Sequence, residues 1–273
     1  MKIFCCLNDD VLANVALNLL LPSLSGHEVR VGLSARIGAP AVAEPMPRRQ
    51  LRLAEQGFTS EVLFPLVERA GYPAEGRYLT FREIERHRGI GVVPFPTPND
   101  ESGLALLRAF APDLVLSIRY GAIFTPAAID VPRLGVLNLH AGLLPAYRGV
   151  IATFRALQAE ESEIGCTLHY IGDSAIDAGP IVGQARVPVD RDRSLFAHVL
   201  SLYPVAIPMV ADAIARLGRN ETLEARVQAG GSYFSYPLAE EWDAFLRRGW
   251  RVVDVDDLCA LSARYLPSPG PSS

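Results

Sequence analysis

An amide and an imidazole stand two residues apart at the end of an apolar run in the middle of the chain. In the stretch GVLNLHAGLLPAYRG, Asn138 and His140 come just before a turn that Gly142 and Pro145 impose on the backbone. On an extended strand, two such side chains project from one face. An amide that donates to an oxyanion and an imidazole that manages a proton suit chemistry at a carbonyl group. Taken alone, the spacing is equally consistent with an Asn satisfied in a turn above a packed His.

The elements that would present this pair begin with a strand, a helix and a strand at the N-terminus. The mostly apolar residues 2–7 predict a buried strand, residues 10–21 predict a helix with Asp9 as its N-cap, and residues 27–33 predict a second strand. A βαβ unit of this kind favours an α/β fold with a doubly wound, mostly parallel sheet. Ligands bind at the carboxyl ends of the strands of such a sheet. The amide and imidazole pair follows an apolar run, so we expect it at that edge.

Downstream, apolar periodicity and turn residues predict further helices and strands. Helices are expected at residues 48–56, 60–70, 80–87, 101–110, 152–160 and 194–217, and strands at 89–93, 113–118, 135–139, 165–171 and 179–187. Pro204 and Pro208 are expected to break or kink the last helix. After Gly218 the chain changes character, with a hairpin-like segment at 227–236 and a short helix at 240–248. We therefore expect a core over residues 1–190 and a C-terminal helix with a small hairpin and helix extension over 191–273.

The composition narrows the class of protein. With 273 residues, 49% of them hydrophobic and 21% charged, the chain can bury a large core. A net charge of -4 argues against a protein whose main partner is nucleic-acid phosphate. The start of the chain does not have the pattern of a signal peptide, and no apolar stretch reaches the roughly 18 residues of a membrane span. We expect a cytoplasmic protein with no membrane partner.

The four cysteines point to a reduced protein without a structural metal. Cys5 and Cys6 are adjacent, so on a strand they face opposite sides and cannot form an ordinary disulfide. The sequence has no CxxC or HxxxH spacing of the kind that holds zinc. A cysteine nucleophile is a competing idea for acyl transfer, but Cys166 lies in an apolar strand with no partner pattern, which favours a buried structural thiol.

Three separated elements in the same order resemble the signature of the folate-dependent formyltransferase family, which includes glycinamide ribonucleotide, methionyl-tRNA and sugar N-formyltransferases. The matching residues are Asn138, His140, Leu143-Leu144-Pro145, Gly149, Thr167-Leu168-His169 and Ile176-Asp177-Ala178-Gly179-Pro180. The resemblance covers about residues 112–189 and the N-terminal βαβ unit only in outline. It implies that residues 1–190 form a formyltransferase catalytic core with a Rossmann-like sheet.

The resemblance implies a catalytic set of Asn138, His140 and Asp177. Asn138 is expected to hydrogen-bond the formyl oxygen and the oxyanion of a tetrahedral intermediate, and His140 to do the same or to shuttle a proton. Asp177 is expected to orient a water molecule and to hold His140 in a useful protonation state. The donor is expected to be 10-formyltetrahydrofolate, with no metal ion.

The same resemblance places the pterin of the folate near residues 117–124 and the turn at 142–145. Recognition of the pterin in this family is largely through main-chain groups, so Tyr120 and Phe124 are plausible pocket walls, although core packing accounts equally well for Phe124. His169 either touches the site or is a core histidine bonded to backbone. The expected folate contacts are Arg119, Tyr120, Gly121, Ile123, Phe124, Leu144 and Pro145.

The loop after the first strand bears on the acceptor. A phosphate-bearing acceptor favours a Gly/Ser-rich turn at a helix N-terminus, whereas this chain has Asn8-Asp9-Asp10, whose carboxylates repel phosphate. Asn8, Asp9, Asp10 and Tyr147 are therefore the candidates for contact with an amine. The competing reading is that an Asp at this point only caps the helix.

These observations favour a small-molecule amine as the acceptor: an amino sugar, an amino acid or a hydroxylamine. Fewer than 60 residues follow Gly218 and they include an acidic run, so we expect no nucleic-acid partner. The alternatives are a methionyl-tRNA-type or purine-type formyltransferase, or a non-catalytic folate-binding relative. The aromatic segment 231–236 is a platform over the site, a contact in a possible homodimer, or a hairpin packed on the core.

Overall fold

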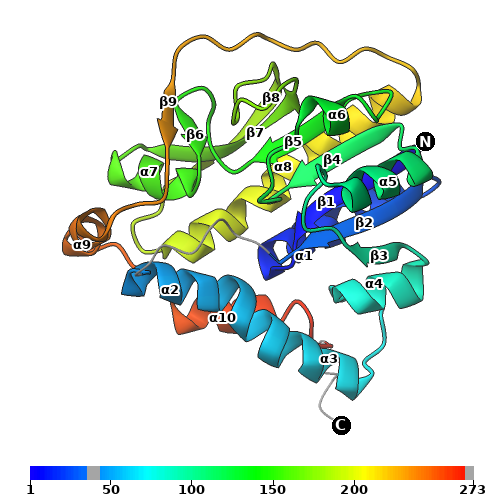
Figure 1. The fold of residues 1–273 in the computed structure, drawn as a ribbon. Helices are drawn as coiled ribbons and strands as arrows, with labels where there is room; N and C mark the ends of the chain where they lie inside the picture. Colours follow the sequence, from blue (N-terminus) through cyan, green and yellow to red (C-terminus); the bar gives the residue numbers. More distant parts are fainter. Residues whose placement is uncertain (36–43, 268–273) are drawn as a thin grey trace.

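The chain folds around a seven-stranded sheet with the strand order β3-β2-β1-β4-β5-β7-β8 (Figure 1). The computed structural model describes residues 1–35 and 44–267. Neighbouring strands from β3 to β5 run parallel, whereas β7 is antiparallel to both β5 and β8. The strands are β1 Lys2–Asn8, β2 Glu28–Ser34, β3 Gly91–Pro94, β4 Leu114–Ile118, β5 Val136–His140, β7 Glu163–Ile171 and β8 Ile181–Pro188. The expected α/β fold with a mostly parallel sheet is confirmed.

The central strands are buried on both faces, as expected for parallel strands covered by helices. Cys5 and Cys6 on β1 illustrate this, because Cys5 belongs to the core on one side of the sheet and Cys6 to the core on the other. Both thiols are fully buried, and burial raises the pKa of Cys5 to about 12. The adjacent cysteines therefore serve as small core residues.

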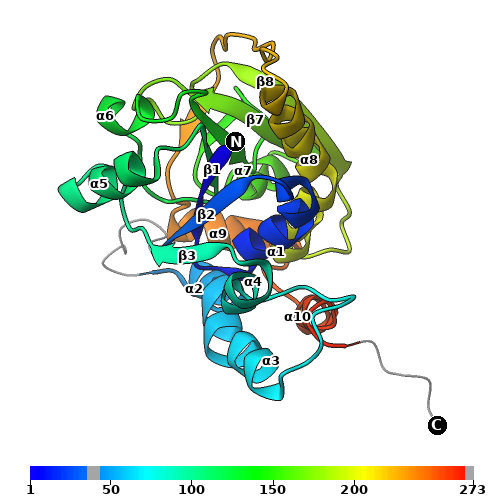
Figure 2. The ribbon, with the colours of Figure 1, turned by 90° about the vertical axis from the view of Figure 1, so that its right-hand side faces the viewer.

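Helices cover both faces of the sheet (Figure 2). On one face, α1 packs against α8, and α8 also packs on β7 and β8; α5 and α6 lie on the other face. The helices outside the 46–70 run are α1 Val11–Leu20, α4 Phe81–Arg88, α5 Glu101–Phe110, α6 Pro126–Ile129, α7 Ala152–Gln158, α8 Leu195–Gly218, α9 Ala239–Arg247 and α10 Val255–Ser262, with a 3₁₀ turn at Leu21–Leu24.

The N-cap of α1 is Asp10 and not Asp9, so the sequence-based assignment was off by one residue. Asp10 has an extended backbone (φ -143°, ψ 164°), and its carboxylate accepts a hydrogen bond from the Ala13 amide at 2.7 Å. This geometry satisfies one of the free amides of the first turn. Asp9 lies one position earlier and is exposed.

Residues 46–70 form one continuous helical run instead of the two helices expected. The run consists of α2 Met46–Arg52, the π-helical segments η2 Leu53–Gly57 and η3 Thr59–Leu63, and α3 Phe64–Ala70. The Phe58 amide donates to the Leu53 carbonyl, and the Phe64 amide donates to the Thr59 carbonyl. These wider turns carry the helix past Gly57, where a break was expected. Such π-turns occur often at functional sites.

The long helix α8 passes through Pro204 and Pro208 without the break that these residues suggested. A proline removes a backbone donor, but here a continuous buried face that includes Leu202, Ala206 and Val210 packs on the sheet and holds the helix together. By length and composition α8 could cross a membrane, yet half of its most apolar window is buried inside the fold. In this structure it is a core helix.

The segment expected to form a hairpin instead pairs with a distant part of the chain. The strand β9 Ser232–Phe234 is parallel to β6 Tyr147–Gly149, and together they form a separate two-stranded sheet. Gly149 and Gly231 have positive φ angles (101° and 90°), and a side chain at Gly231 would collide with the Pro145 carbonyl. The two glycines thus allow the returning chain to lie against the turn that follows β5.

The C-terminal part is packed into the main core. Trp242 and Phe245 of α9 stack around Phe154 of α7, with ring centroids 4.4 and 4.7 Å apart from it. The sequence analysis did not predict α10, and just after it the Tyr265 hydroxyl donates to Asn14 Oδ1 at 2.7 Å. Residues of α8, α9 and α10 share one hydrophobic cluster with β1, β5 and β7.

Candidate active site

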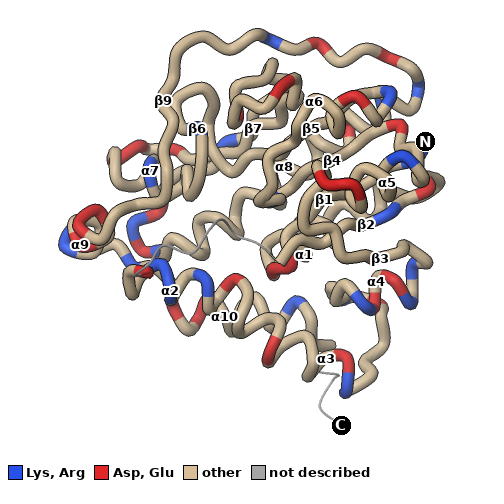
Figure 3. Tube along the Cα trace, in the orientation of Figure 1, with Lys and Arg blue, Asp and Glu red and all other residues tan. Residues whose placement is uncertain are grey.

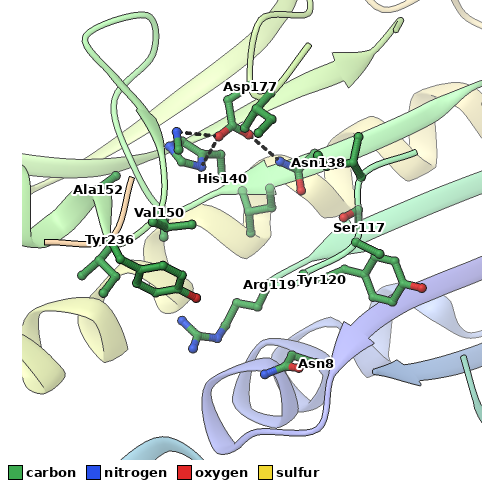
Figure 4. Close-up of a pocket in the computed structure, with 18 of the residues that line it drawn as sticks. Asn8, Ser117, Arg119, Tyr120, Asn138, His140, Val150, Ala152, Asp177 and Tyr236 are labelled. Atoms are coloured by element: carbon green, nitrogen blue, oxygen red, sulfur yellow. Dashed lines mark hydrogen bonds and ion pairs between the residues drawn. The ribbon is translucent and has the colours of Figure 1, made fainter. Parts of the chain in front are cut away.

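Three polar positions lie in register across neighbouring strands. Ser117 of β4 pairs with Asn138 of β5, and Asn138 pairs with His169 of β7. The loop between β7 and β8 brings Asp177 over this row, with Asp177 itself at φ 51°. These residues and His140 line one side of a cavity of about 320 Å³ (Figure 4). Its other walls come from more distant segments of the chain. A cavity of this size suits part of a small molecule.

Asp177 is the hydrogen-bonding centre of the site. Its Oδ2 accepts from the Gly149 amide at 2.9 Å and lies 3.4 Å from Nδ1 of His140, while its Oδ1 accepts from Nδ2 of Asn138 at 3.3 Å. Burial opposes ionisation of the carboxyl group, but His140, His169 and the Gly149 amide outweigh it and lower the pKa of Asp177 to about 2. The side chain is therefore a carboxylate at neutral pH.

The imidazole of His140 is held on both sides by protein groups. Its Nε2 lies 2.7 Å from the Tyr147 carbonyl, which can only accept, so Nε2 is the donor. The nitrogen that gains or loses a proton is therefore Nδ1, which faces Asp177. Gly142 makes room for this arrangement, because a Cβ there would lie 2.6 Å from Nε2.

Asn138 directs its amide nitrogen towards His169 and Asp177. Nδ2 lies 3.0 Å from Nε2 of His169, whose Nδ1 lies 2.9 Å from the Tyr170 carbonyl and must be its donor. Nε2 of His169 therefore faces both Asn138 and, at 3.5 Å, Oδ1 of Asp177. The amide oxygen of Asn138 points away from Asp177 (Figure 4). To donate to an oxyanion, the amide must make a half turn, which requires a hydrogen on Nε2 of His169. Both readings of His169 hold together: it bonds to backbone and it touches the site.

The expected folate segment forms one wall of the cavity. Residues 119–124 all line it, and Ile123, 51% exposed, offers an apolar surface there, as does Ile176 on the loop that carries Asp177. The Tyr120 hydroxyl donates to the Phe95 carbonyl at 2.8 Å, which fixes its ring. Phe124 is 2% exposed and serves mainly as a core residue.

Two expected folate contacts lie outside the cavity lining, and a third turns its side chain elsewhere. Leu144 is buried under the turn and its amide donates to Thr167 Oγ1 at 3.0 Å; neither it nor Pro145 lines the cavity. The guanidinium of Arg119 leaves this wall and pairs with Asp10 and Glu55. At Arg119 only the backbone is free to meet a pterin.

The candidates for contact with the acceptor are placed unequally. Asn8 lines the cavity, whereas Asp10 is 2% exposed and is occupied by its capping bond and by Arg119. Asp9 lines a separate hollow beside β3 and α4. The Tyr147 hydroxyl donates to Glu161 at 2.7 Å outside the cavity, and Tyr147 serves the site only through its carbonyl.

The other walls of the cavity hold residues that the sequence analysis missed. They come from the 46–70 helical run, the turn before α7, the helix α8 and the chain after β9. The residues concerned are Arg48, Leu51, Arg52, Glu55, Val150, Ile151, Val199 and Tyr236. Arg48, Leu51 and Glu55 follow the i, i+3, i+7 spacing of one helix face, which is the signal that could have grouped them.

Cys166 has no chemical role that the geometry supports. It is 1% exposed, and burial raises the pKa of its thiol to about 12, so it is not a thiolate at neutral pH. In residues 1–35 and 44–267 there is no group of three or more His, Cys, Asp or Glu side chains arranged to hold a metal ion.

Comparisons with known proteins agree on one family. The model of the formyl transferase family matches residues 97–197. The methionyl-tRNA formyltransferase of Parafrankia sp. (strain EAN1pec) is 33% identical over 233 residues, which are 85% of this chain and 73% of that relative. The enzyme of the same name from Pseudomonas fluorescens (strain SBW25) is 36% identical over 150 residues, 54% of this chain and 46% of the relative, so here the match spans about half of the relative's length.

A solved structure shows the same fold at lower identity. The N-formyltransferase from Helicobacter canadensis, crystallised with folinic acid and dTDP-3-aminofucose, has a TM-score of 0.53 and 19% identity to this chain. The superposition covers 86% of this chain and 71% of the other.

Proposed function

Because the chain belongs to the formyltransferase family, we propose that it transfers the formyl group of 10-formyltetrahydrofolate to the amino group of a small molecule. The observation that carries this proposal is the meeting of Asn138, His140 and Asp177 on one wall of a cavity, with the closest side-chain contacts at 3.3 and 3.4 Å. An amide, an imidazole and a carboxylate in contact are the groups that acyl transfer to an amine requires when no covalent nucleophile takes part.

The donor fits the wall formed by residues 119–124. Backbone groups at the end of β4 are available to the polar edge of a pterin, and the exposed side chains of Ile123 and Ile176 offer apolar surface to its faces. The ring of Tyr120, held by its hydrogen bond to the Phe95 carbonyl and stacked on the Phe95 ring, forms the end of this wall. In support of this assignment, the related fold from H. canadensis was crystallised with folinic acid.

The positions of the polar groups support the following course of the reaction. The lone pair of the acceptor amine attacks the formyl carbon, a C–N bond forms, and the carbonyl electrons move to oxygen. Asn138, after the half turn of its amide, donates to that oxyanion. When the oxyanion collapses, the bond between the formyl carbon and the folate nitrogen breaks, and that nitrogen takes up the proton lost by the amine. The ionised Asp177 stabilises a positive charge on His140 while the proton is in transit.

A tRNA acceptor is the second candidate, because the curated relatives described above are methionyl-tRNA formyltransferases. The small molecule is favoured by the cavity of about 320 Å³ and by the charges of the described C-terminal part. The first turns of α9 and α10 carry Glu240, Glu241, Asp256 and Asp257, and Figure 3 shows acidic and basic residues side by side on α9. Binding of a nucleic acid favours a surface dominated by basic residues.

The proposal is tested by supplying 10-formyltetrahydrofolate with a panel of amines and following the absorbance of tetrahydrofolate. The panel contains amino sugars free and linked to nucleotides, amino acids, hydroxylamines and methionyl-tRNA. We expect turnover with at least one small amine and none after Asn138→Ala. Turnover with methionyl-tRNA alone would transfer the assignment to the second candidate, and no turnover combined with no binding of 5-formyltetrahydrofolate would refute the proposal.

A further inference from the structure

A buried cluster of two carboxylates and one guanidinium lies across the cavity from the catalytic residues. Nε of Arg119 lies 3.1 and 2.9 Å from the two carboxylate oxygens of Asp10, and its Nη2 lies 3.0 Å from Oε2 of Glu55. Asp10 is 2% and Glu55 6% exposed. Figure 4 shows the Arg119 guanidinium and Asn8 on the opposite side from Asn138 and His140.

Within its direct contacts the cluster holds one positive charge fewer than negative charges, while Arg48 and Arg52 on the same wall pair with Glu44. Buried charges are stable when each is matched by an opposite charge, and here one guanidinium faces two carboxylates. The imbalance falls on Glu55: burial raises its pKa, Arg119 opposes the shift, Asp10 adds to it, and the result is a pKa of about 7. A second cation in the cavity would restore the balance and keep Glu55 ionised.

A hydrogen-bond acceptor stands beside this cluster without a donor. Asn8 is fully buried and donates through Nδ2 to Asp10 at 2.8 Å, but its Oδ1 has no hydrogen-bond partner among the described residues. Asn8 lines the cavity. A buried amide oxygen of this kind is costly in free energy unless a ligand or an ordered water donates to it.

The backbone on both sides of the ion pair is in a rare conformation. Glu55 lies in the π-helical segment η2, and Arg119 has φ 57°, in the left-handed region that a residue with a Cβ seldom adopts. Strain of this sort is retained where it places functional groups. A surface ion pair would not need either conformation.

We infer that Glu55 and Asn8 receive the ammonium group of the acceptor and that Glu55 takes its proton before the amine attacks the formyl carbon. The inference rests on the proposed function. In this step an N–H bond of the ammonium breaks, an O–H bond forms on the Glu55 carboxylate, and the freed lone pair is the nucleophile. Asn8 Oδ1 accepts a second N–H of the same group.

The site therefore selects basic aliphatic amines. Such amines are ammonium ions at neutral pH and supply the missing positive charge. Hydroxylamines and aromatic amines are weakly basic, carry no charge at this pH, and leave the excess carboxylate uncompensated.

The test compares two probes of nearly the same shape, n-butylammonium and n-butanol, as competitors of formyl transfer and in ligand-observed NMR. We expect wild-type protein to bind n-butylammonium about 10- to 100-fold more tightly than n-butanol at pH 7.5. Glu55→Gln should remove most of this preference. Glu61→Gln, the same change at an exposed position of the same helical run, should keep it. Equal binding of the two probes to wild-type protein would overturn the inference without any variant.

Binding of 5-formyltetrahydrofolate, measured by calorimetry in each variant, separates the possible failures. Unchanged folate binding in Glu55→Gln shows an intact fold and donor site, so a retained preference for ammonium in that variant would also overturn the inference. Loss of folate binding and turnover in the wild-type protein would instead count against the proposed function. Asn8→Leu provides a second variant, expected to weaken n-butylammonium by about tenfold and n-butanol little.

Discussion

The two walls of the cavity are built on different physical terms. The wall of β5 holds Asn138 and His140 in a connected network around Asp177, whose pKa of about 2 keeps it ionised at any working pH. The opposite wall holds Glu55, whose pKa of about 7 lets it exchange a proton near neutrality. One carboxyl group is a fixed charge and the other is able to titrate during the reaction.

Under the proposed function, this difference assigns the chemical step to one wall and the selection of the acceptor to the other. Strand ends are rigid and hold Asn138 and His140 at fixed spacing, which suits the stabilisation of a short-lived charge. The opposite wall is assembled from a helix, a loop and the segment after β9, elements that can differ without disturbing the sheet. Variants of each wall should therefore fail in different kinetic terms.

The largest effect is expected from Asp177→Asn. Loss of the carboxylate removes the counter-ion of His140 and one partner of Asn138, so kcat should fall by about 10²-fold or more. Steady-state kinetics at saturating amine measures this, with calorimetry of 5-formyltetrahydrofolate as the check on folding. A folded variant with a near-wild-type kcat would show that Asp177 takes no part in catalysis.

A smaller loss is expected from His169→Phe. This change removes the group that holds the amide of Asn138, so kcat should fall about tenfold while the KM for the amine changes little. His169→Gln, which keeps a polar partner for Asn138, should recover part of the rate. If both variants lost activity to the same extent, or only through KM, a packing role would explain His169 better than positioning.

The meeting of Asn138, His140 and Asp177 on the wall of β5 was open to prediction because all three belong to one sequence motif, while their catalytic role stays a prediction. Asn138 and His140 share β5, and Asp177 lies in the loop between β7, which pairs with β5, and β8, so the order of the motif matches the order of these elements. The first βαβ unit indicated the mostly parallel α/β sheet, but it did not predict the order of the strands or the antiparallel β7. One boundary was wrong by a residue, since Asp9 and Asp10 are equally good caps in sequence and only the backbone angles choose Asp10.

The opposite wall was hidden for physical reasons. The spacing of Arg48, Leu51 and Glu55 marks one helix face, but it does not say what that face packs against. Gly57 favours a break in the helix, and the π-turns that carry the run past it could not be read from the apolar periodicity. Tyr236 reaches the cavity through the pairing of two three-residue strands far apart in sequence. Pairing of such short strands depends on the tertiary packing around Gly149 and Gly231 and leaves no alternation to read.

Two variants test which wall of the cavity binds the folate donor and which binds the amine acceptor. Ile123→Ser removes apolar surface from the wall assigned to folate, and we expect its KM for 10-formyltetrahydrofolate to rise about fivefold with little change for the amine. Tyr236→Ala removes the ring that lies 3.6 Å from the Arg48 guanidinium, and we expect the KM for the amine to rise a few fold with little change for folate. The opposite pattern, or equal changes in both KM values, would contradict the division of the cavity.

The smallest effect is on stability and has opposite signs for the two carboxyl groups. Burial raises the folded-state pKa of Glu55 above its unfolded value, so protonation of Glu55 adds to the free energy of unfolding. This contribution is complete below about pH 4.5 and is lost as the pH rises through about 7. Glu55→Gln leaves Arg119 paired with Asp10 alone, and should raise the melting temperature by a few degrees at pH 8 and little at pH 5.

The pKa of Asp177 is lowered, so Asp177→Asn should reduce the melting temperature at pH 8, and the reduction should shrink only as the pH falls from about 4 towards 2. Thermal melts of both variants across this range measure the contrast. A Glu55→Gln protein that is less stable than wild type at pH 8 would mean that the second carboxylate stabilises the fold, and the case for a missing cation in this cluster would fall with it.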